Sequence, residues 1–172
     1  MFQTSSFRFS SSFARGAPAI SAQQPLSDDQ LRRVVPSVFA ESAHESRSSR
    51  YAYIPTSAVL ASLRREGFEV FSATQAKARA EDRRSFTNHM LRLRHASAGG
   101  DAQGAQEIVL LNSHDGSSSY QLMGGVFRMV CANGLIVPDG VCQRVKVQHS
   151  GDVRQLVTKG AFEVLDGLTR VV

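Results

Sequence analysis

The sequence predicts an α+β fold, a largely antiparallel sheet with two N-terminal helices and a C-terminal helix. Two helix patterns come first along the chain, then several segments in which apolar and polar residues alternate, then one more helix pattern. Helices that are segregated from strands in this way are typical of α+β proteins, whereas regular alternation would predict a parallel sheet. A chain of 172 residues is long enough for one domain with its own core.

The first residues, 1–15, contain no acid and are rich in Ser, Phe and Arg. This composition resembles that of an organellar transit peptide. A flexible arm, or a short edge strand with Phe7, Phe9 and Phe13 on one face, explains it as well. We expect a flexible N-terminal arm over 1–25 and a single α+β domain over 26–172.

Capping signals mark the two N-terminal helices. Ser27 is a good N-cap, and acids follow it in the first turn, so a helix is expected over 28–35 that stops before Pro36. Thr56 or Ser57 can cap a second helix that runs to Glu66 and ends at a glycine, residue 67. Its expected buried face consists of Val59, Leu60 and Leu63.

The following segments alternate with the period of a strand. Strands are expected over 68–73, 86–94 and 145–149, and the continuous apolar run at 108–111 predicts a central strand. The segment 120–137 fits either a strand or a helix in its first half. Within 86–94, leucines fall on one face and arginines on the other.

A terminal helix is expected to begin after Asp152. Its apolar residues at helical spacing are Leu156, Val157, Phe162, Leu165 and Leu168. We expect this stripe to pack against a second copy of the chain, because an uncovered apolar stripe of this size is usually buried in an interface. A homo-oligomer is therefore predicted.

Positive charge is concentrated in one part of the chain. Residues 47–94 hold ten basic and four acidic residues, a surplus of six, whereas the whole molecule carries +5. Clustered basic side chains attract polyanions, of which nucleic acid is the commonest in a cytoplasm. A solvated surface that only maintains solubility is the alternative. No apolar run reaches the roughly 20 residues of a membrane span, so no membrane partner is expected.

The candidate nucleic-acid contacts combine arginines with nearby aromatic rings. Arginines on one strand face and in the preceding turn suit phosphates, and tyrosines could stack on unpaired bases. Arg128 lies among apolar neighbours in the sequence, so its guanidinium needs either a carboxylate or a phosphate partner. The candidates are Arg83, Arg84, Arg92, Arg94, Arg128, Tyr51 and Tyr53. Replacing Arg92 and Arg94 with alanine is expected to weaken DNA binding and to leave the fold intact.

A polar turn of uncertain role follows the predicted central strand, with Asn112, His114 and Asp115 in it. His114 and Asp115 could act as a base and its orienting carboxylate. They could also be two metal ligands, completed by His89, His95 or His149. A tight turn whose side chains satisfy backbone groups is the structural alternative. No hydrolase or zinc signature is present, so we expect no catalytic residue, metal or cofactor.

The two cysteines, Cys131 and Cys142, do not have the spacing of a metal site. Two thiols that are reduced and packed suit a cytoplasmic protein.

Six segments, in order along the chain, resemble the motif series of a phage- and plasmid-borne family known as domain of unknown function 932. They are PSVFA at 36–40, SRYAYIPT at 49–56, LRREGF at 63–68, HMLRLR at 89–94, LNSHDG at 111–116 and FRMVCANG at 127–134. The resemblance covers about 26–151, and family members usually continue past the terminal helix, so this chain resembles a shortened version. The resemblance implies a phage or plasmid setting and assigns no catalytic residue.

These observations favour a cytoplasmic accessory protein of a mobile element that binds nucleic acid, with single-stranded DNA as the preferred ligand. The first alternative is a counter-defence protein that binds a host defence complex, similar to an anti-CRISPR protein. The second is a metal-dependent enzyme centred on His114 and Asp115.

Overall fold

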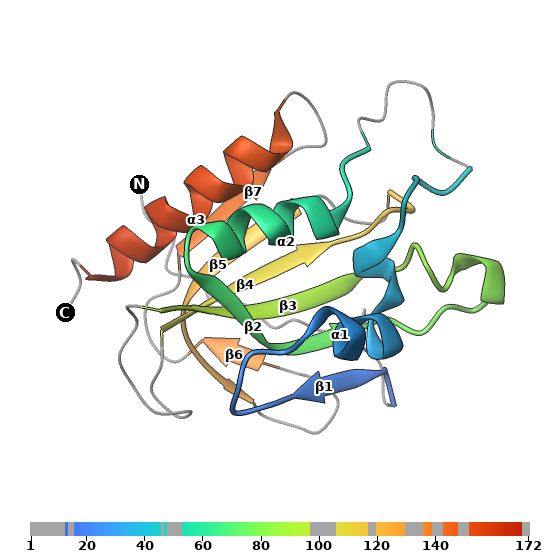
Figure 1. Cartoon of the computed structure of the whole chain (residues 1–172), viewed down its shortest axis with the longest axis horizontal. Helices are drawn as coiled ribbons and strands as arrows, with labels where there is room; N and C mark the ends of the chain where they lie inside the picture. Colours follow the sequence, from blue (N-terminus) through green and yellow to red (C-terminus); the bar gives the residue numbers. More distant parts are fainter. Residues whose placement is uncertain are drawn as a thin grey trace.

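The computed structural model describes residues 13, 16–45, 47, 53–96, 106–116, 120–129, 136–138, 143–147 and 152–169. One antiparallel sheet carries helices on one of its faces (Figure 1), so the predicted α+β class is confirmed. Along the part of the chain that the structure describes, helices α1 and α2 precede the long strands, and α3 follows the last of them.

Among the described residues the sheet contains seven strands, in the order β1–β2–β3–β4–β5–β6, and β7 pairs with β5 as well. The strands are β1 (Ala19–Ser21), β2 (Phe68–Gln75), β3 (His89–His95), β4 (Gln106–Asn112), β5 (Tyr120–Met129), β6 (Ile136–Pro138) and β7 (Gln143–Val147). The segment from residue 120, which the sequence left open between strand and helix, therefore begins as a strand. Strand β1 lies within the segment expected to be an arm, and it pairs with β2 at one edge of the sheet.

The helices begin and end at the expected signals with one exception. They are α1 (Asp28–Val34), the 3-10 helix η1 (Pro36–Phe39), α2 (Thr56–Arg65), the 3-10 helix η2 (Glu81–Arg83) and α3 (Val153–Thr169). Ser27 caps α1 as predicted, and Gly67 follows α2 with a φ of 89°. The prediction that Thr56 or Ser57 caps α2 is wrong, because the N-cap is Pro55 and Thr56 is the first helical residue. The Thr56 hydroxyl is used elsewhere.

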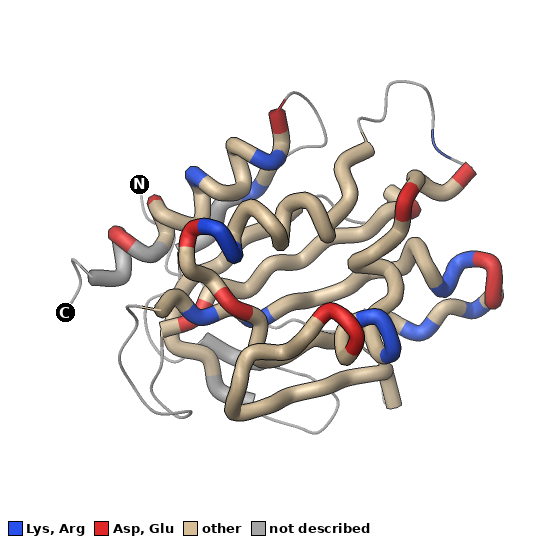
Figure 2. Tube along the Cα trace, in the orientation of Figure 1, with Lys and Arg blue, Asp and Glu red and all other residues tan. Residues whose placement is uncertain are grey.

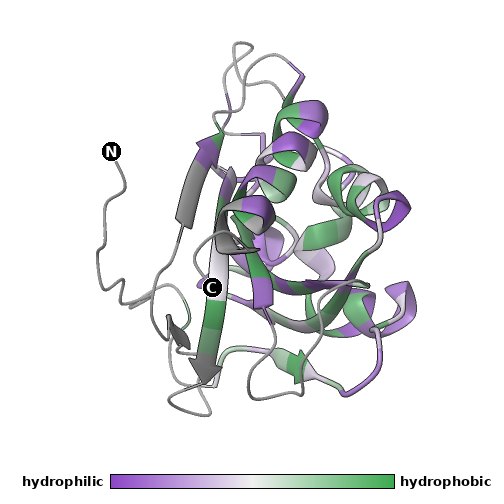
Figure 3. Ribbon diagram, turned by 90° about the vertical axis from the view of Figure 1, so that its left-hand side faces the viewer, coloured by the Kyte–Doolittle hydropathy of each residue, from purple (hydrophilic) through white to green (hydrophobic). Residues whose placement is uncertain are grey.

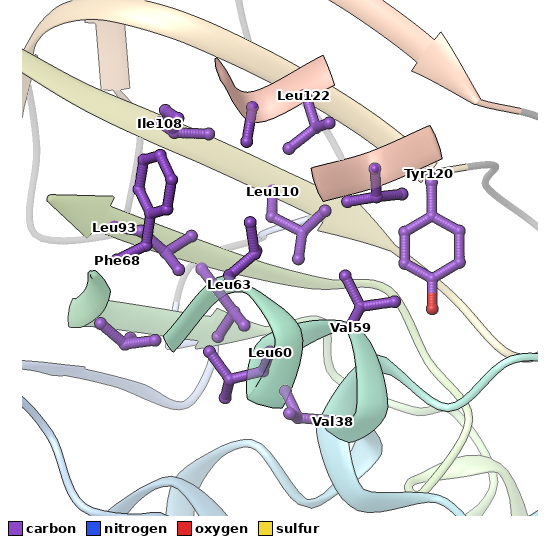
Figure 4. Packing of buried hydrophobic residues seen from close by; sticks show 14 of the residues in the cluster. Val38, Val59, Leu60, Leu63, Phe68, Leu93, Ile108, Leu110, Tyr120 and Leu122 are labelled. Carbon is purple, nitrogen blue, oxygen red and sulfur yellow. The ribbon is translucent and has the colours of Figure 1, made fainter. Parts of the chain in front are cut away.

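The main core lies between the sheet and the helices. In Figure 4, apolar side chains of α2 face those of the central strands, among them Leu93, Leu110 and Leu122. The predicted buried face of α2, Val59, Leu60 and Leu63, is at most 1% exposed. In Figure 3 the apolar residues of the helices are turned toward the sheet. Apolar residues that recur with helical spacing thus pack against apolar residues that alternate along the strands, as an α+β core requires.

The apolar stripe of α3 differs from the predicted one. The helix turns Val153, Val157, Ala161 and Val164 into the protein's own core, whereas Leu156 and Phe162 are 48% and 37% exposed. The side chains of Leu165 and Leu168 lie outside the described residues. The face of α3 that meets the core therefore shares Val157 with the predicted stripe, whereas Leu156 and Phe162 of that stripe keep apolar surface exposed.

Candidate nucleic-acid interface and the buried polar network

Arg92 and Arg94 of β3 share one buried carboxylate. The Nε of Arg92 donates to Oε2 of Glu107 at 2.7 Å, and the Nε of Arg94 donates to Oε1 at 2.9 Å. Glu107 is 3% exposed and Arg92 is 8% exposed. The Arg94 guanidinium also lies 4.7 Å from the centre of the Phe71 ring. Both arginines therefore have an internal partner, and Arg92 is not on an open surface.

This face of the sheet, opposite the helices, holds a second apolar cluster. Its buried members are Phe13, Met90, Val109, Met123 and Phe127. The alternation in β3 correctly predicts leucines toward the helices and arginines on the opposite side. Arg92 on that side is nevertheless buried and Arg94 is half-buried, so each needs a carboxylate to offset its desolvation.

Arg83 and Arg84 lie on a connection that projects from the sheet. This basic connection, residues 76–88 between β2 and β3, extends away from the helices on the right of Figure 1, and Figure 2 shows its mixed charge. Its exposed cations are Lys77, Arg79, Arg83 and Arg84, and its acids are Glu81 and Asp82 in η2. No ion pair joins these four cations to another residue that the structure describes.

The remaining predicted contacts do not join this connection. The side chains of Tyr51 and Arg128 lie outside the described residues. Tyr53 is half-buried, donates its hydroxyl to the Ala40 carbonyl and packs edge-on against the His114 ring at 5.2 Å. Its hydroxyl is therefore engaged inside the fold. Two exposed arginines outside the predicted set, Arg32 and Arg33, lie in the last turn of helix α1.

The polar turn after β4 contributes to a buried polar network. The ends of three strands lie close to η1 and the start of α2 (Figure 1). Each of these elements supplies a polar side chain to the network. The members of the network are Ser37, Thr56, Gln75, His89, Asn112 and His114, none more than 1% exposed. Thr56 Oγ1 is its hub, at 2.8 Å from Nε2 of His89, 3.1 Å from Nε2 of His114 and 3.0 Å from Nδ2 of Asn112.

Burial lowers the pKa of His89 from 6.5 to about 3, with a further contribution from the neighbouring His114 ring. The two ring centres are 5.4 Å apart. His89 is therefore neutral at physiological pH and serves as a hydrogen-bonding group. The 0% exposure of both rings gives a substrate no access to them in this conformation.

Another histidine that was proposed to complete a metal site, His95, lies away from His89 and His114. His95 stands at the far end of β3, where its Nε2 hydrogen-bonds the Glu66 carbonyl and its ring packs on Phe68. Within the described ranges, no group of three or more His, Cys, Asp or Glu residues is placed to hold a metal ion. His149, Cys131 and Cys142 fall outside those ranges.

The polar turn ends at a glycine in the left-handed region of backbone conformation. Gly116 has a φ of 79°, and a Cβ there would approach the Arg47 guanidinium to 2.1 Å. His114 anchors the turn through backbone bonds, donating its N–H to the Phe86 carbonyl and accepting from the His44 N–H. The turn is therefore tied to the base of the basic connection.

Among the described residues, no helix is long and apolar enough to cross a membrane.

Comparison with known proteins gives a family but no activity. Two curated proteins of Escherichia coli (strain K12), UPF0380 protein YafZ and UPF0380 protein YfjQ, are each 52% identical to this chain over 157 residues. The match covers 90% of this chain and 56% of each relative, so the chain spans about half the length of the curated relatives it matches. No solved structure gives a significant match.

The family described as Domain of unknown function (DUF932) matches residues 43–171, about three quarters of the chain. This range includes strands β2 to β7, helices α2 and α3, and the basic connection. Both the family match and the 52% identity agree with the motif resemblance. The chain belongs to the DUF932 family.

Proposed function

We propose that this chain is a nucleic-acid-binding accessory protein of a phage or plasmid, acting in the cytoplasm, with single-stranded DNA as its preferred ligand. The observation that carries the proposal is the basic connection, where four exposed cations project on one short segment. Guanidinium groups form charge-assisted, often bidentate hydrogen bonds with phosphate oxygens. The two acids of η2 leave the connection with a net charge of +2.

The preference for a single strand is supported by the size and composition of the connection. A segment of this length can follow one phosphate backbone. Phe86, half-buried against His44, lies two residues after Arg84 and would offer a ring to an unpaired base. Self-association remains part of the proposal, because Leu156 and Phe162 keep apolar surface exposed on α3.

The test is a salt titration of binding to an oligothymidylate and to a duplex of equal length. The variant replaces Arg83 and Arg84 with glutamine. The matched control replaces Arg65 and Arg154, two exposed arginines on α2 and α3, and changes the net charge equally. Each lost phosphate contact lowers the slope of log K against log salt by roughly 0.7 for single strands, so a loss of about 1.4 is expected.

The control should bind the single strand nearly as tightly as the wild type, with an unchanged slope. Equal affinity and slope in the two variants would remove the basic connection from the interface. Tighter binding of the duplex than of the oligothymidylate would contradict the preference for single strands.

A further inference from the structure

The buried polar network extends to the basic connection through Gln75, the last residue of β2. Its Oε1 accepts hydrogen bonds from the Ser37 hydroxyl at 2.7 Å and from the Ser37 backbone N–H at 2.9 Å. Its Nε2 donates to the carbonyl of Arg84 at 2.6 Å. One amide, 1% exposed, thus joins η1 to the backbone of a candidate phosphate-binding residue.

The proton positions in this network follow from what each group can donate. Oε1 of Gln75 only accepts, so the single Ser37 hydroxyl proton points toward it. Ser37 Oγ must then accept from Nδ1 of His89, 2.9 Å away. The Thr87 carbonyl, 3.2 Å from the same nitrogen, also requires a donor there. His89 therefore carries its proton on Nδ1.

The neutral His89 ring leaves its Nε2 as an acceptor, and the Thr56 hydroxyl donates to it. Thr56 Oγ1 then has two lone pairs left. Nδ2 of Asn112 and Nε2 of His114 donate to them. The result is a chain of hydrogen bonds in which each group donates to the next, from the turn after β4 to the Arg84 carbonyl.

The end of this chain fixes the base of the basic connection. The Thr87 hydroxyl lies 3.2 Å from the Ala76 carbonyl and 3.4 Å from the Arg84 carbonyl, and its one proton can serve either. At the base, the His114 N–H also donates to the Phe86 carbonyl at 2.9 Å. Beyond the base, the other described backbone bonds of the connection are short-range turns, such as the Arg84 N–H to the Glu81 carbonyl and the Phe86 N–H to the Arg83 carbonyl. Local turns of this kind open easily unless something holds their ends. The Gln75 amide holds one end of these turns, because it links the core to the Arg84 carbonyl.

We propose that Gln75 is a positioning residue for nucleic-acid binding: its amide holds the Arg84 backbone so that Arg83 and Arg84 meet the phosphates together. The inference rests on the proposed function. A held loop loses less conformational entropy on binding than a mobile one, and this raises its affinity without a new contact.

The experiment compares Gln75→Leu with Tyr120→Phe in the full chain. Leucine removes the amide and leaves all four cations of the connection in place. The control removes a different hydrogen bond, from the Tyr120 hydroxyl to the Ile54 carbonyl at 2.8 Å, which involves neither Gln75 nor a residue of the connection. Amide hydrogen exchange is measured at Arg83, Arg84 and Phe86, and binding to oligothymidylate is measured at one salt concentration.

We expect roughly tenfold faster exchange of these three amides in Gln75→Leu than in the control, the effect of losing one hydrogen bond. Affinity for oligothymidylate should fall about fivefold, and the control should bind like the wild type. Equal exchange in the two variants would overturn the positioning role. Faster exchange without weaker binding, in a protein whose Arg83→Gln/Arg84→Gln variant does lose binding, would overturn its link to the ligand.

If neither the Gln75→Leu nor the arginine variant changes binding, the proposed function fails, while the exchange data still decide whether Gln75 positions the connection. A Gln75→Glu variant separates positioning from a general loss of stability. Burial favours the neutral carboxyl, which can donate to the Arg84 carbonyl as the amide does, whereas the ionised form cannot. Exchange in Gln75→Glu should therefore be slow at low pH and become faster as the pH rises and the carboxyl ionises, relative to Tyr120→Phe at each pH. The absence of this pH-dependent rescue would also overturn the proposal.

Discussion

Lowering the pH should destabilise this protein through His89. The pKa of this imidazole is 6.5 in the unfolded chain and about 3 in the folded protein. Because the folded value is the lower one, the unfolded state takes up the proton first. The contribution of neutral His89 to stability is therefore complete above about pH 6.5 and is lost as the pH falls toward 3.

The size of the effect follows from the shift. Each pKa unit corresponds to about 1.4 kcal/mol, so the loss is about 2 kcal/mol at pH 5 and approaches about 5 kcal/mol near pH 3. The physical cause is desolvation of the cation, reinforced by His114. In addition, a protonated Nε2 would face the Thr56 hydroxyl as a second donor, so their 2.8 Å hydrogen bond would have to reverse or break.

The assay is urea unfolding at about pH 7 and about pH 5 for the wild type and for His89→Gln, which removes the titrating group. Other histidines and carboxylates titrate in the same window, so the quantity of interest is the difference between the two proteins. The wild type should lose about 2 kcal/mol more than the variant. An equal loss would refute the reasoning, as would an NMR titration in which the folded His89 ring protonates near pH 6.5.

Two further predictions concern the second sheet face and α3. Glu107→Gln should lower the free energy of unfolding by about 3 kcal/mol, because it leaves two arginines without their shared charge partner; urea unfolding that shows less than about 1 kcal/mol would contradict this. Light scattering of the wild type should give a multiple of 18.7 kDa, and Leu156→Lys should shift it toward the monomer. A wild-type monomer mass at all concentrations would end the oligomer proposal.

Local patterns predicted the fold class well. The alternation of leucine and arginine at 91–94 identified β3, and pairing of this strand with β2 and β4 agrees with its predicted faces. The cap at Ser27 and the glycine at 67 marked helix ends correctly, because both signals act within one turn. The α3 stripe was misassigned because a helix with apolar residues on several sides does not reveal which of them meets the sheet.

The candidate site depended on contacts that no local pattern carries. The buried polar network joins residues 33 to 58 positions apart along the chain. Thr56 was expected to be an N-cap, but a threonine that follows a proline fits the first helical position as well as it fits the N-cap. A polar residue at each strand end was the available signal, but only the meeting of three strand ends with η1 and α2 makes these residues one network.

The same tertiary contacts change what the charge surplus means. Of the ten basic residues in 47–94, Arg64, Arg92 and Arg94 are paired with described carboxylates. Two of these carboxylates, Asp28 and Glu107, lie outside that segment, so counting charge within it overstates what a ligand meets. Replacing Arg92 and Arg94 with alanine would strand a carboxylate that is 3% exposed, a destabilising change expected to cost about 3 to 5 kcal/mol. Weaker DNA binding by that variant would thus report a damaged fold, and substitutions at Arg83 and Arg84 are needed to examine the interface itself.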